Sequence, residues 1–131
     1  MRTLTDHKLN GLNEALTITV LDEPGAGGAC HKYAISLSVP PDDPIGMPKD
    51  LNYSIWHIDF QNGPIQEAQY NGVSGEALLA INIDRLRSFQ AGPYKCRENA
   101  CALTHLEEAL MWLQKRTRDR LARGVEGTHK V

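Results

Sequence analysis

The sequence predicts an α+β fold in which a small antiparallel β-sheet is followed by a C-terminal hairpin of two helices. Hydrophobic residues alternate with polar ones in the first half of the chain and recur with helical spacing in the second half. The length of 131 residues argues for one domain, residues 1–131. Its expected parts are a flexible N-terminus, a strand-rich part, a helical hairpin and a C-terminal loop, at residues 1–13, 14–72, 73–123 and 124–131.

Three segments of the strand-rich part have the pattern of half-buried strands. In residues 16–22 and 33–39, large apolar side chains alternate with small or polar ones, and residues 53–60, YSIWHIDF, form a third such segment. The glycine-rich residues 23–32 and the proline-rich residues 40–50 separate these segments as loops.

A turn follows the third predicted strand. The dipeptide Asn62-Gly63 is typical of a β-hairpin, so a returning strand is expected to start at Pro64-Ile65. Because proline cannot donate a hydrogen bond to a neighbouring strand, this strand would lie at an edge of the sheet or have the proline as its first residue.

The spacing then predicts a first helix beginning after Ser74, a good N-cap residue, with an apolar stripe formed by Leu79, Ile83 and Leu86. The sequence Ala-Gly-Pro at residues 91–93 ends this helix, and its proline suits the first turn of the next one.

The second helix is expected to run to about Arg123, with Gly124 as its C-cap. About 30 helical residues span about 45 Å, whereas a compact domain of this size is about 35–40 Å across. The helix would therefore extend beyond its own domain, and its leucine seam is expected to pack on another subunit. This seam consists of Leu103, Leu106, Leu110 and Leu113.

The charges are divided unevenly along the chain. The net charge is −2, but residues 1–84 contain four basic and eleven acidic side chains, and residues 85–131 contain ten basic and five acidic ones. The C-terminal third is therefore expected to meet an anion. A small phosphorylated ligand fits this charge as well as nucleic acid does, and a pI near 6.2 argues against binding to long nucleic acid.

Other features favour a soluble protein in a reducing cytosol. The three cysteines include no CxxC pair, so neither a disulfide framework nor a zinc ribbon is expected. No apolar run approaches the roughly 20 residues that cross a bilayer, and the N-terminus lacks the apolar stretch of a signal peptide.

The sequence contains no sign of catalysis. His105 and Glu108 have the i, i+3 spacing of metal ligands, but without a second pair a solvated helix face is favoured. Asp42 and Asp43 lie in a proline-rich loop and are expected to form turns. No nucleophile elbow, zinc-protease or Walker motif occurs, so no catalytic residue, metal or cofactor is predicted.

Two features have the chemistry of a ligand site. Phe89 lies just beyond the first predicted helix, where it could stack a nucleobase, and Asn99 could read a base or ribose edge; the alternative for Phe89 is a core position. Arg116 and Arg120 share a helix face and suit phosphates. A solvated basic face is their alternative, but the adjoining GVEGT segment has two glycines that allow close approach of a ligand to the backbone.

The spacing along the second helix restricts where such a site can be. Asn99 and Arg116 are 17 positions apart, or about 25 Å on one straight helix, so a small ligand cannot touch both within one chain. Two antiparallel copies of the helix would bring Asn99 of one chain near Arg116 of the other. The sequence therefore predicts two equivalent pockets at a dimer interface.

A resemblance to a known family rests on three separated blocks of sequence. They are FQNGPIQEAQYNGV, IDRLRSFQAGPYKCRENACALTHLEEALMWL and KRTRDRLARGVEGT, and together they cover about residues 55–129. These blocks resemble the phage Thoeris anti-defence sponge proteins, which are related to anti-CBASS sponges.

The resemblance implies a phage-encoded protein that is not an enzyme and acts in the cytoplasm of the bacterial host. It would bind and sequester, without cleaving, the glyco-cyclic ADP-ribose isomers that signal in Thoeris. Some members of the family also hold cyclic trinucleotides of CBASS in separate pockets of a hexamer. A dimer or a trimer of dimers is therefore expected.

The resemblance also assigns residues to the pocket. Phe89 and Asn99 would line it, Arg116 and Arg120 would come from the partner chain, and the C-terminal loop would close over the ligand. The loop residues are Gly124, Val125, Glu126, Gly127 and Thr128. For a second ligand site the candidate is Lys32, which lies beside the glycine-rich segment GAGGAC. This segment could expose backbone amides to a phosphate, but a plain flexible loop is the favoured interpretation.

Two alternatives remain open from the sequence. The first is a phosphodiesterase-like enzyme that degrades the same signals, for which His105, Glu107 and Glu108 are the available acid–base candidates. The second is a small nucleic-acid-binding protein that uses the basic C-terminal segment.

Overall fold

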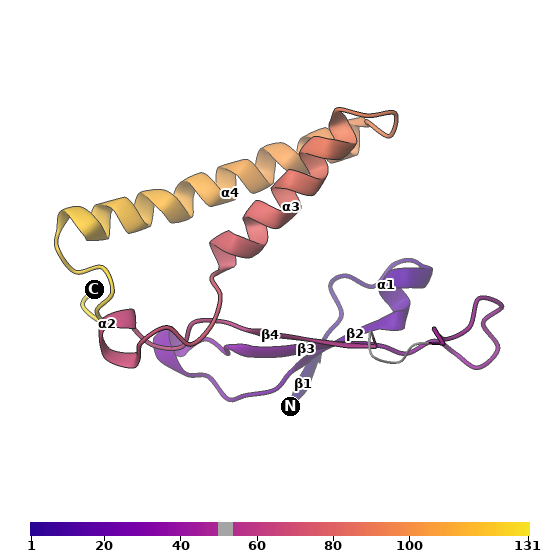
Figure 1. Cartoon of the computed structure of the whole chain (residues 1–131), viewed down its shortest axis with the longest axis horizontal. Coiled ribbons are helices and arrows are strands. Elements are labelled where there is room, and N and C mark those ends of the chain that lie inside the picture. The colour runs from indigo at the N-terminus through magenta and orange to yellow at the C-terminus, as the bar shows by residue number, and fades with distance from the viewer. Residues whose placement is uncertain (50–53) are drawn as a thin grey trace. The chain divides into compact units, whose positions relative to one another are not determined.

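The structure is a computed structural model that describes residues 1–49 and 54–131. The chain has an α+β fold, with the strands first and the long helices last, as the sequence predicts (Figure 1). The end of the predicted proline-rich loop, Asp50, and the start of the predicted third strand, Tyr53, lie outside the described residues.

The chain forms two compact units. We call Met1–Gly63 together with Tyr70–Gly72 the sheet unit, and Pro64–Gln69 together with Val73–Val131 the hairpin unit.

The sheet unit contains a four-stranded antiparallel sheet in which each strand pairs with the next one along the chain. Its strands are β1 (Arg2–Leu4), β2 (Leu16–Val20), β3 (Lys32–Leu37) and β4 (Ile55–Asp59). Strands β2 and β4 fall within segments that the sequence predicts as strands, and β3 begins one residue before its predicted segment, at Lys32. The prediction of an antiparallel sheet is confirmed.

The N-terminal segment is more ordered than the sequence suggests. The sequence of β1 does not predict a strand, because Leu4 is its single apolar residue and its three residues show no alternation. Arg2 nevertheless pairs with Val20 of β2. A short helix, α1 (Gly11–Ala15), follows, and the Asn10 side chain caps it by accepting the N–H of Asn13 at 3.2 Å.

The centre of the sheet unit is small. Val20 and Ala15 are buried, and so is the side chain of His31. The rings of Tyr33 and Phe60 meet edge to face, with their centroids 5.7 Å apart. Val20, His31 and the two rings lie at the end of the sheet where β2 runs into the glycine-rich connection, whereas Ala15 precedes β2.

The glycine-rich connection is ordered by hydrogen bonds within the sheet unit. It contains a single 3₁₀ turn, η1 (Ala26–Gly28), and the N–H of Gly25 donates to the carbonyl of Ala29 at 2.7 Å. The N–H of Ala26 donates to the side-chain oxygen of Asn62 at 3.2 Å. These amides are satisfied within the sheet unit, which favours the plain-loop interpretation of GAGGAC over a phosphate cradle.

Asp22 anchors the end of the connection. Its carboxylate accepts the backbone N–H groups of His31, at 3.0 Å, and of Lys32, at 3.1 Å. Burial raises the pKa of Asp22, but the backbone N–H groups of His31, Lys32 and Asp22 itself outweigh burial, so the pKa is lowered.

We therefore expect Asp22→Asn to destabilise the protein at neutral pH. A carboxyl group whose pKa is lowered by folding contributes stability above its unfolded pKa, about 3.9, and loses that contribution as the pH falls through the folded value. The difference in unfolding free energy between wild type and variant should thus shrink below about pH 4. Urea titrations across this pH range measure it. The control is Glu23→Gln, an exposed neighbour, and an equal pH dependence in this control would refute the role of Asp22.

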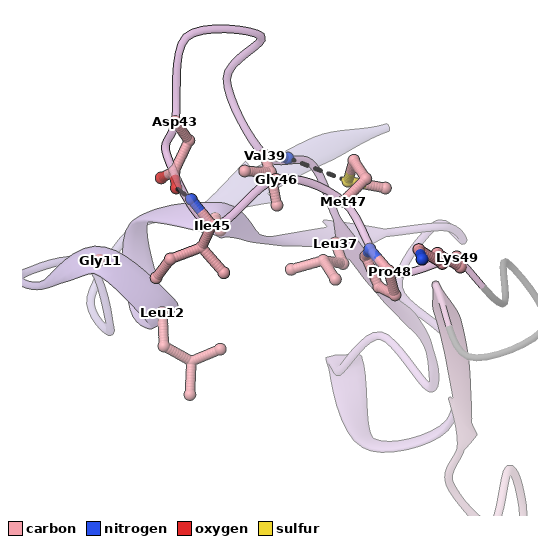
Figure 2. A pocket seen from close by; sticks show the side chains of 11 residues that line it. Gly11, Leu12, Leu37, Val39, Asp43, Ile45, Gly46, Met47, Pro48 and Lys49 are labelled. Atoms are coloured by element: carbon pink, nitrogen blue, oxygen red, sulfur yellow. Dashed lines mark hydrogen bonds between the residues drawn. The ribbon is translucent and has the colours of Figure 1, made fainter.

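An apolar hollow of about 570 Å³ lies at another end of the sheet unit (Figure 2). Its apolar lining includes Leu12, Leu37, Val39, Ile45, Met47 and Pro48. Beside it the carboxylate of Asp43 accepts the N–H of Ile45 at 2.8 Å, which agrees with the predicted turn-forming role of Asp43.

The sequence predicts a returning strand after Asn62-Gly63, and this prediction is wrong. One turn of helix, α2 (Ile65–Ala68), follows Pro64 instead, and Gln69 ends it with a φ of 62°. A proline at this position fits either a strand start or a helix start, since it lacks a donor in both. The helix is favoured here by Glu67 in its first turn and by the docking described below.

The hairpin unit contains two long helices, α3 (Gly75–Gln90) and α4 (Arg97–Ala122). The predicted N-cap is confirmed, since Ser74 Oγ accepts the N–H of Ala77 at 3.1 Å. Residues 91–95 form the turn, so the prediction that the second helix begins at Pro93 is wrong. Cys96 is its N-cap and accepts the N–H of Asn99 through Sγ at 3.4 Å.

The far end of α4 also differs slightly from the expectation. Arg123 is the C-cap, and Gly124, predicted as the cap, follows it with a φ of 70°. With 26 residues, α4 is about 39 Å long, somewhat shorter than the expected 45 Å. It is still ten residues longer than α3, which has 16.

The two helices bury little against each other. Ile83 of α3 is 3% exposed, whereas no residue of α4 is buried. In Figure 1 the helices meet at the turn and separate towards the start of α3 and the end of α4. A hollow of about 330 Å³ lies there, between Glu76 of α3 and Arg118 of α4. None of the helices in the described part of the chain could span a membrane.

Candidate functional site

Phe89 lies in the last turn of α3, not beyond the helix as the sequence suggests. Its ring is 39% exposed, so it is not a core residue of the hairpin unit. The guanidinium of Arg85 lies 5.6 Å from the ring centroid. An exposed ring beside a cation is suited to stacking a nucleobase that carries phosphate nearby.

Asn99 lies in the first turn of α4, at the same end of the hairpin as Phe89. Its backbone N–H donates a hydrogen bond to Cys96 Sγ. None of the residues in the described ranges hydrogen-bonds its half-buried side-chain amide, which leaves that amide available to a ligand.

The two arginines at the other end of α4 differ from each other. Arg116 is exposed and has no ion-pair or hydrogen-bond partner in residues 1–49 or 54–131. Its guanidinium is therefore free to bind a phosphate.

Arg120 is instead enclosed by the C-terminal loop, and its side chain is only 13% exposed. Its Nε donates to Glu126 Oε2 at 3.0 Å and its Nη1 to the carbonyl of Lys130 at 2.6 Å. Its Nη2 donates to the carbonyls of Val125, at 2.9 Å, and Thr128, at 3.0 Å. These four bonds fix the path of the loop that the sequence analysis assigns to the pocket.

The loop also docks on α2, a contact for which the sequence shows no signal. The backbone N–H of Gln66 donates to the carbonyl of Gly127 at 3.0 Å, and its side-chain amide donates to the carbonyl of Glu126 at 3.2 Å. Glu67 Oε1 and His129 Nδ1 are 2.6 Å apart. A Cβ at Gly127 would lie 3.1 Å from the side chain of Ile65 in α2, and the φ of Gly127 is 80°, so the glycine permits this docking.

The candidate site is thus divided between the two ends of one helix. Phe89 and Asn99 lie at the turn, whereas Arg116, Arg120 and the loop lie at the opposite end of α4. Because α4 is continuous from Arg97 to Ala122, Asn99 and Arg116 are about 25 Å apart along it. The hairpin unit of one chain does not bring both groups to one small ligand.

The remaining candidates lie apart from these groups. Lys32 is at the start of β3 in the sheet unit, and its exposed ammonium is 3.9 Å from Asp59. Glu107, a candidate acid–base residue, pairs with Arg87 across the hairpin at 2.7 Å. No cluster of three potential metal ligands occurs in the part of the chain that the structure describes.

The helices also place the chain among known proteins. Residues 55–118 match the family model of the Acb2/Tad1 hairpin domain. Over these residues the chain is similar to the Acb2/Tad1 hairpin family. The matched residues comprise β4, α2, α3 and most of α4.

A curated relative agrees with this Acb2/Tad1 assignment. "Thoeris anti-defense 1" of Bacillus phage SBSphiJ7 is 54% identical over 82 residues, which cover 63% of this chain and 58% of the relative. The match thus spans less than two thirds of the relative's length. The family resemblance inferred from the three sequence blocks is confirmed.

Proposed function

We propose that this chain is a phage counter-defence protein that binds a cyclic nucleotide signal of Thoeris and withholds it without cleavage. The name of the Bacillus phage relative supports the Thoeris part of this proposal. The observation that carries the binding part is the division of suitable groups between the two ends of α4. A stacking ring and a free amide occupy one end, and a free guanidinium beside a glycine-containing loop occupies the other.

A second copy of the chain completes the pocket in this proposal. Two antiparallel α4 helices bring Phe89 and Asn99 of one protomer to Arg116 and the loop of its partner. The outer side of α4 suits such pairing, because Trp112 is 57% exposed and Met111 is 50% exposed although both are large and apolar. A two-fold axis then generates two equivalent pockets.

The ligand of these pockets is a glyco-cyclic ADP-ribose isomer. Its base stacks on Phe89, its polar edge meets Asn99, and its phosphates meet Arg116. Cyclic trinucleotides of CBASS are proposed for a separate site at Lys32 in a trimer of dimers, supported by the exposure of that ammonium. The protein acts in the cytoplasm of the bacterial host.

The test separates a sponge from an enzyme. The purified protein is loaded with glyco-cyclic ADP-ribose, washed and heat-denatured, and the released ligand is analysed by mass spectrometry. Recovery of the intact ligand supports sequestration. Recovery of a hydrolysed product supports the phosphodiesterase alternative, and salt-sensitive binding of long DNA in place of the ligand supports the nucleic-acid alternative.

We expect Phe89→Ala to weaken binding of glyco-cyclic ADP-ribose about tenfold or more, since stacking on an aromatic ring contributes about 1–3 kcal/mol. Isothermal titration measures the loss. The matched control is Tyr94→Ala, which removes an exposed aromatic ring from the adjoining turn. Equal losses in the two variants, or no loss in Phe89→Ala, would exclude Phe89 as the stacking residue.

A further inference from the structure

Only one of the four groups that accept hydrogen bonds from Arg120 is charged. An arginine side chain has five N–H donors. Four hydrogen bonds are present, three of them to main-chain carbonyls and one to the Glu126 carboxylate. Glu126 therefore provides the one anionic contact that this guanidinium makes among the described residues.

The Glu126 carboxylate lies on the accessible side of the pair. Its side chain is 35% exposed, whereas that of Arg120 is 13% exposed. A phosphate offers the same kind of oxygen acceptors to a guanidinium as a carboxylate does. An anion arriving from solvent would thus meet Arg120 at the position that Glu126 occupies.

The loop does not depend on this carboxylate for its path. The carbonyl bonds to Arg120 and the two bonds from Gln66 all involve main-chain oxygens of the loop. The contact between Glu67 and His129, which also holds the loop on α2, does not involve the Glu126 side chain. The carboxylate can leave while the backbone of the loop stays in place.

We propose that the Glu126 carboxylate occupies the anion-binding position on Arg120, and that a phosphate oxygen of an incoming ligand displaces this carboxylate. This inference rests on the proposed function for the identity of the physiological ligand, but the exchange itself requires only a phosphate. Glu126 then turns towards solvent, and Arg120 donates its freed Nε–H to a phosphate oxygen while its Nη groups keep their bonds to the loop carbonyls. Glu126 accordingly lowers the affinity of the site, in contrast to a residue that contacts the ligand.

The test uses Glu126→Gln and inorganic pyrophosphate as the probe, with the NMR signal of the Arg120 Nε–H as the readout. Glutamine keeps the size and one acceptor but removes the competing charge. We expect pyrophosphate to bind Glu126→Gln about two- to fivefold more tightly than wild type, as expected for loss of a partly exposed ion pair. The matched control is Glu67→Gln, which removes the same charge from the same loop contact area without freeing Arg120.

Three outcomes would overturn the exchange. An equal gain in Glu67→Gln would show that net charge alone attracts the anion. A loss of affinity in Glu126→Gln would show that Glu126 supports the site. An unperturbed Arg120 Nε–H signal at saturating pyrophosphate would show that the anion binds elsewhere or not at all.

A parallel titration with glyco-cyclic ADP-ribose separates this inference from the proposed function. Tighter binding of both compounds by Glu126→Gln supports both ideas. If pyrophosphate replaces Glu126 but glyco-cyclic ADP-ribose binds to neither wild type nor variant, the exchange stands and the proposed function fails.

Discussion

Subunits that carry Asn99→Ala and subunits that carry Arg116→Ala are each expected to lose tight binding alone and to recover it when mixed. In each homodimer of the proposed assembly every shared pocket lacks one group. In a mixed dimer one pocket lacks both groups and the other is complete. This result follows from the continuity of α4, which keeps the two side chains about 25 Å apart within a chain.

The experiment mixes the two variants, unfolds and refolds them to exchange subunits, and measures the stoichiometry by isothermal titration. Random pairing makes about half of the dimers mixed, each with one intact site, if the assembly has two-fold symmetry. Arg118→Ala is the control partner, because Arg118 points about 200° away from Arg116 around the helix. Failure to recover binding despite confirmed subunit exchange would place the pocket within one chain and refute the interface.

The hairpin unit should be very sensitive to Ile83→Ala. Ile83 is its one buried hydrophobic side chain among the described residues. Truncation of a buried isoleucine to alanine costs about 2–5 kcal/mol, a large part of the 5–15 kcal/mol that stabilises a typical domain. We expect the α3–α4 hairpin to unfold at a much lower urea concentration, measured by the circular dichroism of the helices.

The matched control is Ile81→Ala. This substitution makes the same chemical change on the same helix, but Ile81 is 58% exposed. Its substitution by alanine should cost well under half as much. Equal losses at the two positions would mean that contact between α3 and α4 does not determine the stability of the hairpin.

The strands show where the sequence is informative and where it is not. The alternation in β2 and β3 predicts them because each has several apolar residues on one face. The three-residue β1 has no such pattern and forms by pairing with β2. Pro64 is compatible with two local structures, and contacts between α2 and the distant C-terminal loop favour the helix.

The candidate site is predictable in its residue types but not in its contacts. An exposed aromatic, an amide and two arginines at helical spacing can be recognised in the sequence. The different states of Arg116 and Arg120 cannot, because the loop carbonyls that enclose Arg120 are placed by the path of the backbone. That path turns at Gly124 and Gly127, both with positive φ.

Three of the four acceptors around Arg120 are carbonyl oxygens of Val125, Thr128 and Lys130. A main-chain carbonyl persists whatever side chain is attached to its residue. Substitution of the side chains of Val125 and Lys130 therefore removes none of these bonds to Arg120. The course of the loop thus depends on the arginine at its centre and on the main chain, and not on the side chains at these two positions.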